Sequence, residues 1–351
     1  MTRILPAGKL PNELLPVLLG TLAGNDPSVL VGPGVGEDAA VVDPATRVPA
    51  TRASAGLVEA DLFAIKTDPI TFATDKIGYY AVHVNANDIA TTGAQPRWFL
   101  ATLLLPLGTA TADVIAIGEG ISSAASSLGI TVCGGHTEIT SAVNRPVICG
   151  TMAGTVGRDA IKHKDSVRTG YRIVMTKSAG NEGTAILARE RGDQLRHKGI
   201  SGKIIDSAAR FLDRLSILPE AQAVRSIQGV AALHDVTEGG VATALLELAQ
   251  TSGCGLSVDL DAIPISPETR ALCEALQIDP LGLIGSGSLL LAVDESSVGQ
   301  VVESIEAEGI AASVIAEVTE YGGAVTAYTA SGNVVLPRFD RDEIARILGA
   351  D

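Results

Sequence analysis

The amino-acid sequence predicts an α+β protein built from two domains. The chain has 351 residues, which is more than one hydrophobic core usually organises. Apolar runs typical of buried strands alternate with segments of helical periodicity, and strands dominate the buried segments up to about residue 160. A charged linker at 158–168 separates the two halves. We therefore expect one domain at 1–160 and a second domain at 161–351.

The first half is expected to begin with a short helix at 12–20 and a glycine loop at 32–36. A polar stretch at 46–58 is irregular enough to be an excursion between two strands. Apolar runs and apolar positions spaced by three and four residues give the other elements. These are strands at 39–42, 62–66, 98–105, 130–133 and 147–155, and helices at 75–90 and 111–128.

The second half starts afresh at Thr169-Gly170 and alternates strands with helices. The expected strands are at 172–176, 230–234, 289–293 and 312–318, and the expected helices are at 181–191, between 202 and 225, and at 239–250, 299–308 and 340–348. Both halves therefore mix helices with strands.

The charge of the chain excludes one class of partner and leaves another open. The formal net charge is −14 at pH 7. Proteins bind nucleic acids through Lys and Arg contacts to phosphates, so no nucleic acid is expected as a partner. A small phosphate compound can still bind when a divalent cation bridges the two negative partners.

The expected location is the cytoplasm. The four cysteines form no Cys-x-x-Cys pair and are too few for a disulfide scaffold of this size, so we expect reduced, mostly buried thiols. The first ten residues lack the apolar core of a secretory signal peptide. No stretch of 18 apolar residues without charges is present, so no membrane-spanning helix is expected.

The first run that suggests chemistry is Gly36-Glu37-Asp38-Ala39-Ala40-Val41, at the end of the glycine loop. A dinucleotide-binding loop needs a helix directly after its glycines, whereas two acids and a strand-like run follow here. A Walker A loop needs Gly-Lys-Ser/Thr, which the chain does not contain. Asp38 therefore belongs either to a solvated acidic turn or to a cation site.

A second acid, Asp68, follows the apolar run at 62–66. Proteins that mix helices and sheets often assemble their sites at strand ends. An Asp before a Pro, here Pro69, is also a common start of a turn, so both interpretations stay open.

Asn87 and Asp88 lie within the helix expected at 75–90. The apolar face of that helix, which includes Ile77 and Val84, continues at the i+4 position to Asp88. A carboxylate on a buried stripe is costly unless it is paired or bound to a metal. Carboxylate and amide oxygens are the hard ligands that Mg²⁺ accepts. The alternative is that Asp88 caps a neighbouring loop.

The run Gly134-Gly135-His136-Thr137-Glu138 follows the strand expected at 130–133. Two glycines permit close approach of a backbone to a ligand, and three polar side chains follow them. Cys133 and His136 form a lone Cys-x-x-His, and the lack of a second ligand pair disfavours zinc. A loop that faces phosphate or Mg²⁺ fits the run better.

The run His234-Asp235-Val236-Thr237-Glu238-Gly239-Gly240 joins an expected strand to an expected helix. Asp235 or Thr237 would cap that helix. The N–H groups near Gly239 and Gly240 would alternatively face an anion. Glycines are unfavourable in a first helical turn, so close approach to a ligand explains this run better than a cap alone.

These five runs lie at strand ends or beside strands, which is improbable for independent surface decoration. Together they predict one divided site that binds polyphosphate through Mg²⁺ and backbone N–H groups.

In this order, the runs resemble the ATP-dependent superfamily of aminoimidazole ribonucleotide (AIR) synthetase. It also includes HypE, thiamine-monophosphate kinase and selenophosphate synthetase. The run that begins at Gly36 looks like the Gly-Asp-Asp-Ala-Ala segment of the family, with Glu37 in place of the first Asp. The run from Asn87 to Pro96 is similar to its Asn-Asp-hydrophobic-Ala-x-x-Gly-Ala-x-Pro element and is the most specific match.

The two remaining runs complete the resemblance. The run at 134–138 lies where members of the superfamily carry Gly-Gly-Asp-Thr or Gly-Gly-Glu-Thr, with His136 in place of the acid. The run at 234–240 resembles the Asp-x-Thr/Ser-x-Gly-Gly segment of the second domain. The matches span about residues 32–295, which is most of the chain.

The resemblance implies a two-domain AIR-synthetase-like (PurM-like) fold. Its N-terminal domain, a mixed sheet or half-barrel, would bind ATP and form a homodimer through joined sheets, and its C-terminal domain would be an α/β sandwich. The implied metal ligands are Asp38, Asp68, Asp88 and Asp235; further ATP contacts are Asn87, Gly135, Thr137, Glu138 and Gly239; and the catalytic candidates are His136 and Asp235.

The resemblance also implies an activity. Members use ATP to phosphorylate an amide-type oxygen or pass the γ-phosphate to another acceptor. The order of the runs is most similar to HypE-like, or AIR synthase-related, proteins, which act in hydrogenase maturation. We therefore expect a Mg-ATP-dependent enzyme of the synthetase or dehydratase type that activates a carbonyl or amide oxygen by phosphorylation. His136 or Asp235 would be its general base.

Three points limit that expectation. HypE ends in a tail whose terminal Cys carries the carbamoyl group, whereas the last cysteine here is Cys273 and the chain ends Gly349-Ala350-Asp351. The acceptor, either a small molecule or a protein-bound group, is not named by any run. A small-molecule kinase of the thiamine-monophosphate type and a non-catalytic ATP-binding scaffold for maturation partners are the alternatives.

Overall fold

A computed structural model describes residues 29–31, 36–43, 62–71 and 75–349. The chain divides into two compact units. The described part of the amino-terminal unit is 29–31, 37–43, 62–71 and 75–161, and that of the carboxy-terminal unit is Gly36 and 162–349. The helix expected at 12–20, the glycine loop before Gly36 and the excursion expected at 46–58 lie outside the described residues.

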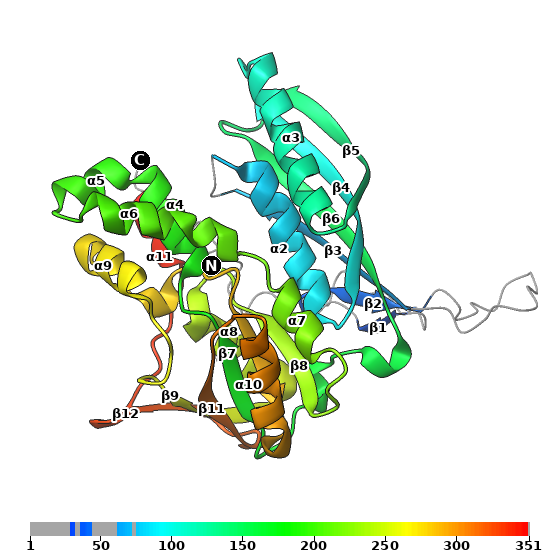
Figure 1. Cartoon of the computed structure of the whole chain (residues 1–351), viewed down its shortest axis with the longest axis vertical. Helices are drawn as coiled ribbons and strands as arrows, with labels where there is room; N and C mark the ends of the chain where they lie inside the picture. The colour runs from blue at the N-terminus through cyan, green and yellow to red at the C-terminus, as the bar shows by residue number, and fades with distance from the viewer. Residues whose placement is uncertain (1–28, 32–35, 44–61, 72–74, 350–351) are drawn as a thin grey trace, which may run out of the picture. The chain divides into compact units, whose positions relative to one another are not determined.

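The amino-terminal unit is a six-stranded mixed sheet with two helices across one of its faces (Figure 1). The strand order is β1-β2-β3-β6-β4-β5, and β4 and β5 are parallel while the other neighbours are antiparallel. The strands are β1 (Val29–Val31), β2 (Ala40–Val42), β3 (Leu62–Ile70), β4 (Gln95–Pro106), β5 (Thr131–Thr140) and β6 (Val147–Val156), and the helices are α2 (Ile77–Thr91) and α3 (Thr111–Ser127).

Small residues let α2 pack closely on both of its neighbours. A Cβ atom at Gly78 would lie 2.7 Å from the Ile117 carbonyl oxygen of α3, and one at Gly154 of β6 would lie 2.7 Å from Cγ2 of Ile89. All residues of α2 except Tyr79 are buried. The sequence predicts that Asp88 lies on one apolar stripe of this helix, whereas in the structure the buried surface of the helix is much wider than one stripe.

The face of the sheet opposite α2 and α3 is open within the described residues. Along β4, Phe99 and Ala101 point toward the helices and are buried, whereas Leu100 between them is 41% exposed. Ile65 of β3, on the same face as Leu100, is also 41% exposed. Strand alternation has therefore placed apolar side chains on a surface that no described element covers.

Two strands are longer than the sequence predicts, and this corrects the position of two candidate runs. β3 continues through Asp68 and pairs with β6 as far as Ile70, so Asp68 lies inside a strand and not at its end. β5 continues through the run at 134–138, which is therefore an edge strand and not a loop. A side chain at Gly135 would collide with the Ala101 carbonyl of β4, so glycine permits this pairing.

The carboxy-terminal unit contains a seven-stranded sheet with the order β13-β12-β9-β11-β7-β10-β8. All neighbouring strands are antiparallel except β12 and β9, which are parallel. The strands are β7 (Arg172–Thr176), β8 (Val230–Asp235), β9 (Cys254–Asp259), β10 (Leu289–Val293), β11 (Ala312–Tyr321), β12 (Val325–Thr329) and β13 (Gly332–Val334).

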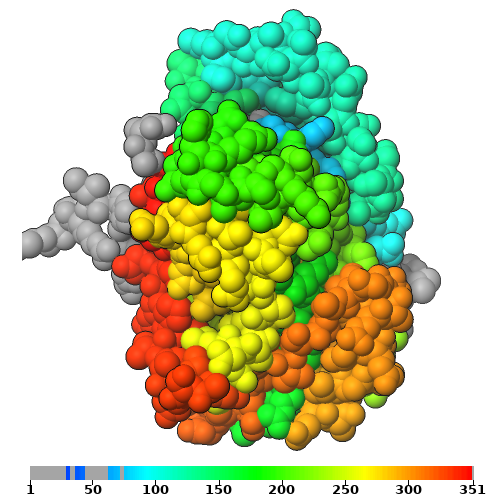
Figure 2. Space-filling view, turned by 60° about the vertical axis from the view of Figure 1, so that its left-hand side comes forward, coloured from blue at the N-terminus to red at the C-terminus, as the bar shows by residue number. Residues whose placement is uncertain are grey.

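The helices of this unit lie on both faces of its sheet. They are α4 (Asn181–Glu190), α5 (Gly192–His197), α6 (Gly202–Ala209), α7 (Leu218–Val224), α8 (Gly240–Ser252), α9 (Pro267–Leu276), α10 (Val298–Ala307) and α11 (Glu343–Leu348), with five short 3-10 turns in the described chain (Arg158–Ala160, Lys164–Ser166, Arg210–Arg214, Pro280–Gly282 and Glu295–Ser297). In Figure 1, α8 and α10 lie on opposite sides of the sheet. Figure 2 shows α5, α6 and α9 forming one continuous surface of the unit.

The main core of the carboxy-terminal unit lies between α8 and one face of the sheet. Leu245 and Leu248 of α8 pack there with alternate strand residues such as Ile173 and Leu290. Intervening strand residues such as Val174 are also fully buried, because helices cover the second face as well. A strand buried on both faces reads as a continuous apolar run, which is why the sequence predicted β7 and β10 correctly.

All four cysteines are free thiols. Cys254 and Cys273 are buried, Cys149 is half-buried and Cys133 is exposed. The expectation that the thiols are mostly buried is therefore met by two of the four cysteines. Among the described helices, none is long and apolar enough to cross a membrane.

Candidate functional site

The Asn87-Asp88 pair near the end of α2 is buried in the amino-terminal unit. Asn87 is fully buried and Asp88 is 3% exposed. Lys66 of β3 reaches Asp88, and its Nζ lies 3.3 Å from Oδ2. A buried carboxylate needs a cation or strong donors, and Lys66 supplies the cation. Sequence reasoning missed Lys66, whose only local sign was one cation in the otherwise apolar start of β3.

Asn85 ties the same helix to β3. Its Nδ2 donates to the Ala81 carbonyl at 2.9 Å and to the Asp68 carbonyl at 3.3 Å. Gly150 of β6 makes room for this amide, because a Cβ there would collide with Asn85. The backbone at Asp68 is thereby fixed beside α2, while the Asp68 side chain is half-buried.

His83 lies one turn before Asn87 on α2 and is buried. Its ring stacks on Tyr79 with the centroids 4.0 Å apart, and among the described residues neither ring nitrogen has a hydrogen-bond partner. Burial lowers the pKa of His83 to about 4, so the imidazole is neutral at physiological pH. An unsatisfied buried ring costs free energy and often marks a functional region. No pattern in the sequence indicated a role for this histidine.

The run on β5 is exposed along its whole length. His136 Nε2 lies 3.8 Å from Glu138 Oε2, and both side chains are more than half exposed. Gly135 and Thr137 are exposed as well. The run therefore presents polar side chains on an edge strand, where the sequence predicted a loop facing phosphate.

Asp38 lies two residues before β2 begins at Ala40, and it is half-buried. The residue two positions earlier, Gly36, belongs to the carboxy-terminal unit. The Gly36 carbonyl accepts a hydrogen bond from Nζ of the buried Lys164, and a side chain at Gly36 would collide with Thr251 of α8. Close packing therefore explains this glycine without a dinucleotide.

Asp235 is the last residue of β8, pairs with Leu289 of β10 and is 1% exposed. The neighbouring His234 is also buried, with Nε2 3.3 Å from Oε2 of Glu247 on α8. The predicted junction from strand to helix is correct, since α8 begins five residues after Asp235.

The sequence predicted that N–H groups near Gly239 face an anion. In the structure the Gly239 amide does face an anion, which is a side chain of the same protein. The Gly239 N–H donates to Oδ2 of Asp342 at 2.6 Å. Gly239 and Gly240 both adopt left-handed backbone conformations, with φ of 85° and 65°. The N-cap position of α8 is Gly239 itself, and the Thr237 carbonyl accepts the N–H of Gly240 at 3.1 Å. Sequence reasoning could not find Asp342, which lies 103 residues further along the chain.

Neither unit gathers a metal site by itself. Among the described residues, no three Asp, Glu, His or Cys side chains of a single unit bring ligand atoms within 4.8 Å of one another. Mg²⁺ does not require such a set, because it commonly keeps several waters and binds one or two carboxylates together with substrate phosphates. The oxygen donors of the candidate runs match that chemistry.

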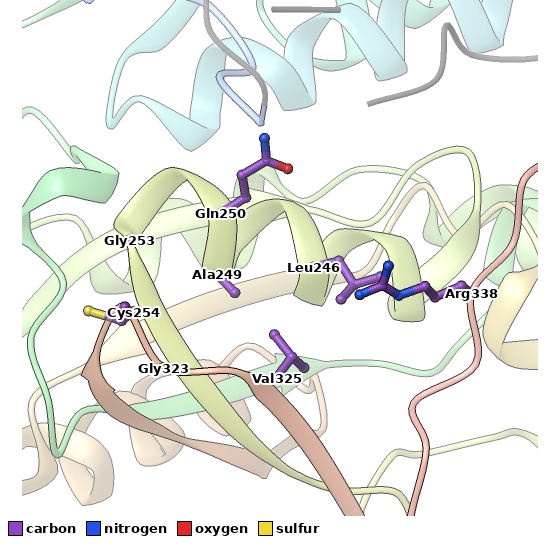
Figure 3. Close-up of a pocket in the computed structure, with 9 residues that line it drawn as sticks. Leu246, Ala249, Gln250, Gly253, Cys254, Gly323, Val325 and Arg338 are labelled. Carbon is purple, nitrogen blue, oxygen red and sulfur yellow. The ribbon is translucent and has the colours of Figure 1, made fainter. Parts of the chain in front are cut away.

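A separate hollow of about 370 Å³ lies in the carboxy-terminal unit, away from the predicted runs (Figure 3). Leu246 and Ala249 of α8 face Val325 of β12 across it, and Arg338 reaches toward Leu246. The Gln250 amide points away from these side chains. Its walls are mainly apolar, and none of its lining residues belongs to a run that the sequence analysis selected.

Comparison with known proteins places the chain in a family. The model of the AIR synthase related protein N-terminal domain matches residues 36–156, and that of the C-terminal domain matches residues 168–328. Carbamoyl dehydratase HypE of Rhodobacter capsulatus is 32% identical over 313 residues, which cover 87% of each chain. The chain belongs to the AIR synthase-related superfamily.

Solved structures agree with this membership. A crystal structure of Escherichia coli HypE matches with a TM-score of 0.70 and 25% identity, covering 93% of this chain and 97% of that one. A structure of HypE in complex with ATP matches with a TM-score of 0.67 and 22% identity, covering 97% and 98%. The predicted two-domain AIR-synthetase-like fold is therefore confirmed.

Proposed function

We propose that this member of the AIR synthase-related superfamily is a Mg-ATP-dependent enzyme that activates a carbonyl or amide oxygen by phosphorylation. The observation that carries the proposal is the buried Asn87-Asp88 pair on α2, held beside β3 by Lys66. The HypE relative named above is a carbamoyl dehydratase, and one matching structure is a complex with ATP.

The acidic side chains and Lys66 suggest a separate role for each group. Asp38, Asp68 and Asp88 of the amino-terminal unit and Asp235 of the carboxy-terminal unit are the proposed Mg²⁺ ligands. Bound Mg²⁺ would neutralise phosphate charge and align the γ-phosphate with the acceptor oxygen. Lys66 compensates the charge of Asp88 and keeps its carboxylate in one orientation.

The polar side chains and glycines of the other runs complete the proposal. Gly135, Thr137 and Glu138 are proposed ATP contacts with Asn87, and His136 and Asp235 are the candidates for the general base. The general base must take a proton from the acceptor group. Replacing the residue that acts as the base, by His136→Gln or by Asp235→Asn, should therefore remove the acidic limb of the pH–rate profile. Replacing the other residue should leave that limb in place.

The direct test follows the acceptor oxygen. An ¹⁸O-labelled S-alkyl thiocarbamate is incubated with ATP and Mg²⁺. Dehydration breaks the C–O bond, releases the thiocyanate and moves the ¹⁸O into inorganic phosphate, with ADP as the other product. A kinase instead leaves the phosphate on the acceptor, and a scaffold gives neither product. Absence of ¹⁸O-phosphate with carbamoyl and amide probes alike would contradict the proposal.

We also propose that the protein is a homodimer formed through the open face of the amino-terminal sheet. Ile65 and Leu100 expose apolar side chains on that face. Monomeric proteins rarely leave such a surface uncovered. Sedimentation of Leu100→Asp as a monomer, beside a dimeric wild type and a dimeric Thr111→Asp control on α3, would support this arrangement. A monomeric wild type would reject it.

A further inference from the structure

Asp342 is the N-cap residue of α11, and its carboxylate lies inside the carboxy-terminal unit. The residue is 1% exposed. Oδ1 accepts the N–H of Ile344 at 2.8 Å and that of Ile284 at 3.2 Å, while Oδ2 accepts the N–H of Gly239 at 2.6 Å. One side chain therefore joins three segments that are distant in the sequence. These are the loop at 235–240, the loop at 281–288 and α11.

The two loops also contact each other directly. The Thr237 carbonyl accepts the N–H of Gly285 at 3.3 Å and that of Gly240 at 3.1 Å. A side chain at Gly240 would collide with the Leu281 carbonyl. The loop that begins at Asp235 thus has its shape set by two left-handed glycines and by the carboxylate that binds one of them.

The C-terminal segment that carries Asp342 is packed into the unit on both sides of this residue. Leu336 is a member of the main core, and Ile344 is fully buried. Phe339 lies against Gly282, where a side chain would collide with its ring. The Asp342 carboxylate is therefore held in place by a segment that is packed into the unit.

The charged groups near Asp342 do not neutralise it. Glu238 of the first loop is an acid and raises the pKa of Asp342. Arg341 donates to the Ala345 carbonyl, and Glu343 pairs with Arg346 at 2.6 Å. The loop at 281–288 carries no charged side chain. Backbone N–H dipoles, including those at the amino end of α8, hold the carboxylate. Burial outweighs them and raises its pKa to about 7.

We propose that Asp342 is a positioning residue that clamps the 235–240 loop against the 281–288 loop and so fixes Asp235. Its role in catalysis rests on the proposed function of Asp235, whereas the clamp itself does not. Each hydrogen bond is strongest when the carboxylate is ionised, because a charged acceptor binds N–H groups more tightly than a neutral acid. Burying that charge costs more than these bonds return, so protonation near neutral pH favours the closed arrangement of the two loops.

The clamp can be observed in the full chain without any ligand. In protein labelled with ¹⁵N-glycine and ¹⁵N-isoleucine, the amide protons of Gly239 and Ile284 should shift together between pH 5 and 9, with one midpoint close to 7. Asp342→Asn should abolish this common midpoint and speed hydrogen exchange in both loops about tenfold or more. Asp340→Asn, at an exposed acid two residues earlier, is the matched control and should leave both unchanged.

Separate readouts distinguish failure of the clamp from failure of the proposed enzyme. Amides of Gly239 and Ile284 that do not titrate in the wild type would overturn the clamp, even if Asp342→Asn fails to fold. Equal exchange in Asp342→Asn and Asp340→Asn would also overturn it. If the wild type shows the titration but no phosphate release from ATP, the clamp stands and the proposed function fails. If both hold, Asp342→Asn should lower kcat about tenfold with ATP affinity within threefold, and Asp342→Glu should restore part of kcat.

Discussion

The two units each bury a carboxylate near a candidate run, and they stabilise it by different means. In the amino-terminal unit, Asp88 is 3% exposed and meets the cation of Lys66. In the carboxy-terminal unit, Asp342 is 1% exposed and meets three backbone N–H groups. A cation neutralises the buried charge, whereas N–H dipoles only solvate it. Burial raises the pKa of Asp342 to about 7, so its charge depends on pH near neutrality.

The largest expected effect concerns the pH dependence of stability. The pKa of Asp342 is raised from 3.8 to about 7, so the folded state holds this proton to a higher pH and stability falls as pH rises from about 4 to 7. The pKa of His83 is lowered from 6.5 to about 4, so stability falls in the opposite direction, as pH drops from 6.5 to 4. The two contributions are roughly 4 and 3 kcal/mol, at about 1.4 kcal/mol per pKa unit.

Because the two groups oppose each other, single variants separate them. Urea unfolding between pH 4 and 8 should show that Asp342→Asn removes the loss of stability toward neutral pH, while His83→Gln removes the loss toward acid pH. If both variants and the wild type show the same dependence of stability on pH, the two units do not differ in how pH changes their stability.

Next in size is the loss of the charged partner of Lys66. Asp88→Asn removes a proposed Mg²⁺ ligand and the negative charge that faces Lys66, so we expect kcat/KM for phosphate release from ATP to fall on the order of 10²–10³-fold. Asp113→Asn, at an exposed acid of α3 in the same unit, should change it less than twofold. A wild-type rate for Asp88→Asn would remove this pair from the site.

The smallest expected effects come from two glycines that permit close packing. Gly240→Ala meets both a left-handed backbone and the Leu281 carbonyl, so it should destabilise the protein by roughly 2–4 kcal/mol. Gly150→Ala meets the Asn85 side chain, which can shift, so about 1–3 kcal/mol is expected. Gly118→Ala in α3 has open space and should stabilise by up to about 1 kcal/mol. If thermal unfolding shows a larger loss of stability for Gly150→Ala than for Gly240→Ala, the loop around Gly240 accommodates a side chain more easily than the sheet around Gly150.

The sequence predicted most elements because the buried strands are continuous apolar runs and the long helices have clear periodicity. It missed β1, β9, β12, β13, α5 and α9. β9 begins Cys254-Gly255 and contains a serine, which weakens its apolar pattern. Gly255 is needed there because a side chain would collide with Thr319, a long-range contact with no local sign.

The candidate residues were found where acids and glycines occur together in sequence, and they were missed where the partner is distant. Asp88 was identified as a buried carboxylate in need of compensation, but nothing near it in the sequence indicated Lys66. The amide of Gly239 was identified as an anion site, but its anion, Asp342, belongs to the last helix of the chain. Local sequence patterns therefore showed which groups need a partner, but they did not show which residue is that partner.

Asp342 also changes how the amino end of α8 responds to solutes. A carboxylate attached to the same fold behaves as a tethered ligand, with an effective concentration on the order of millimolar or higher. Free phosphate or sulfate must exceed that concentration before it competes for the amide of Gly239. This helix terminus therefore remains occupied in ordinary buffers, and any ligand that binds there must first displace the C-terminal segment.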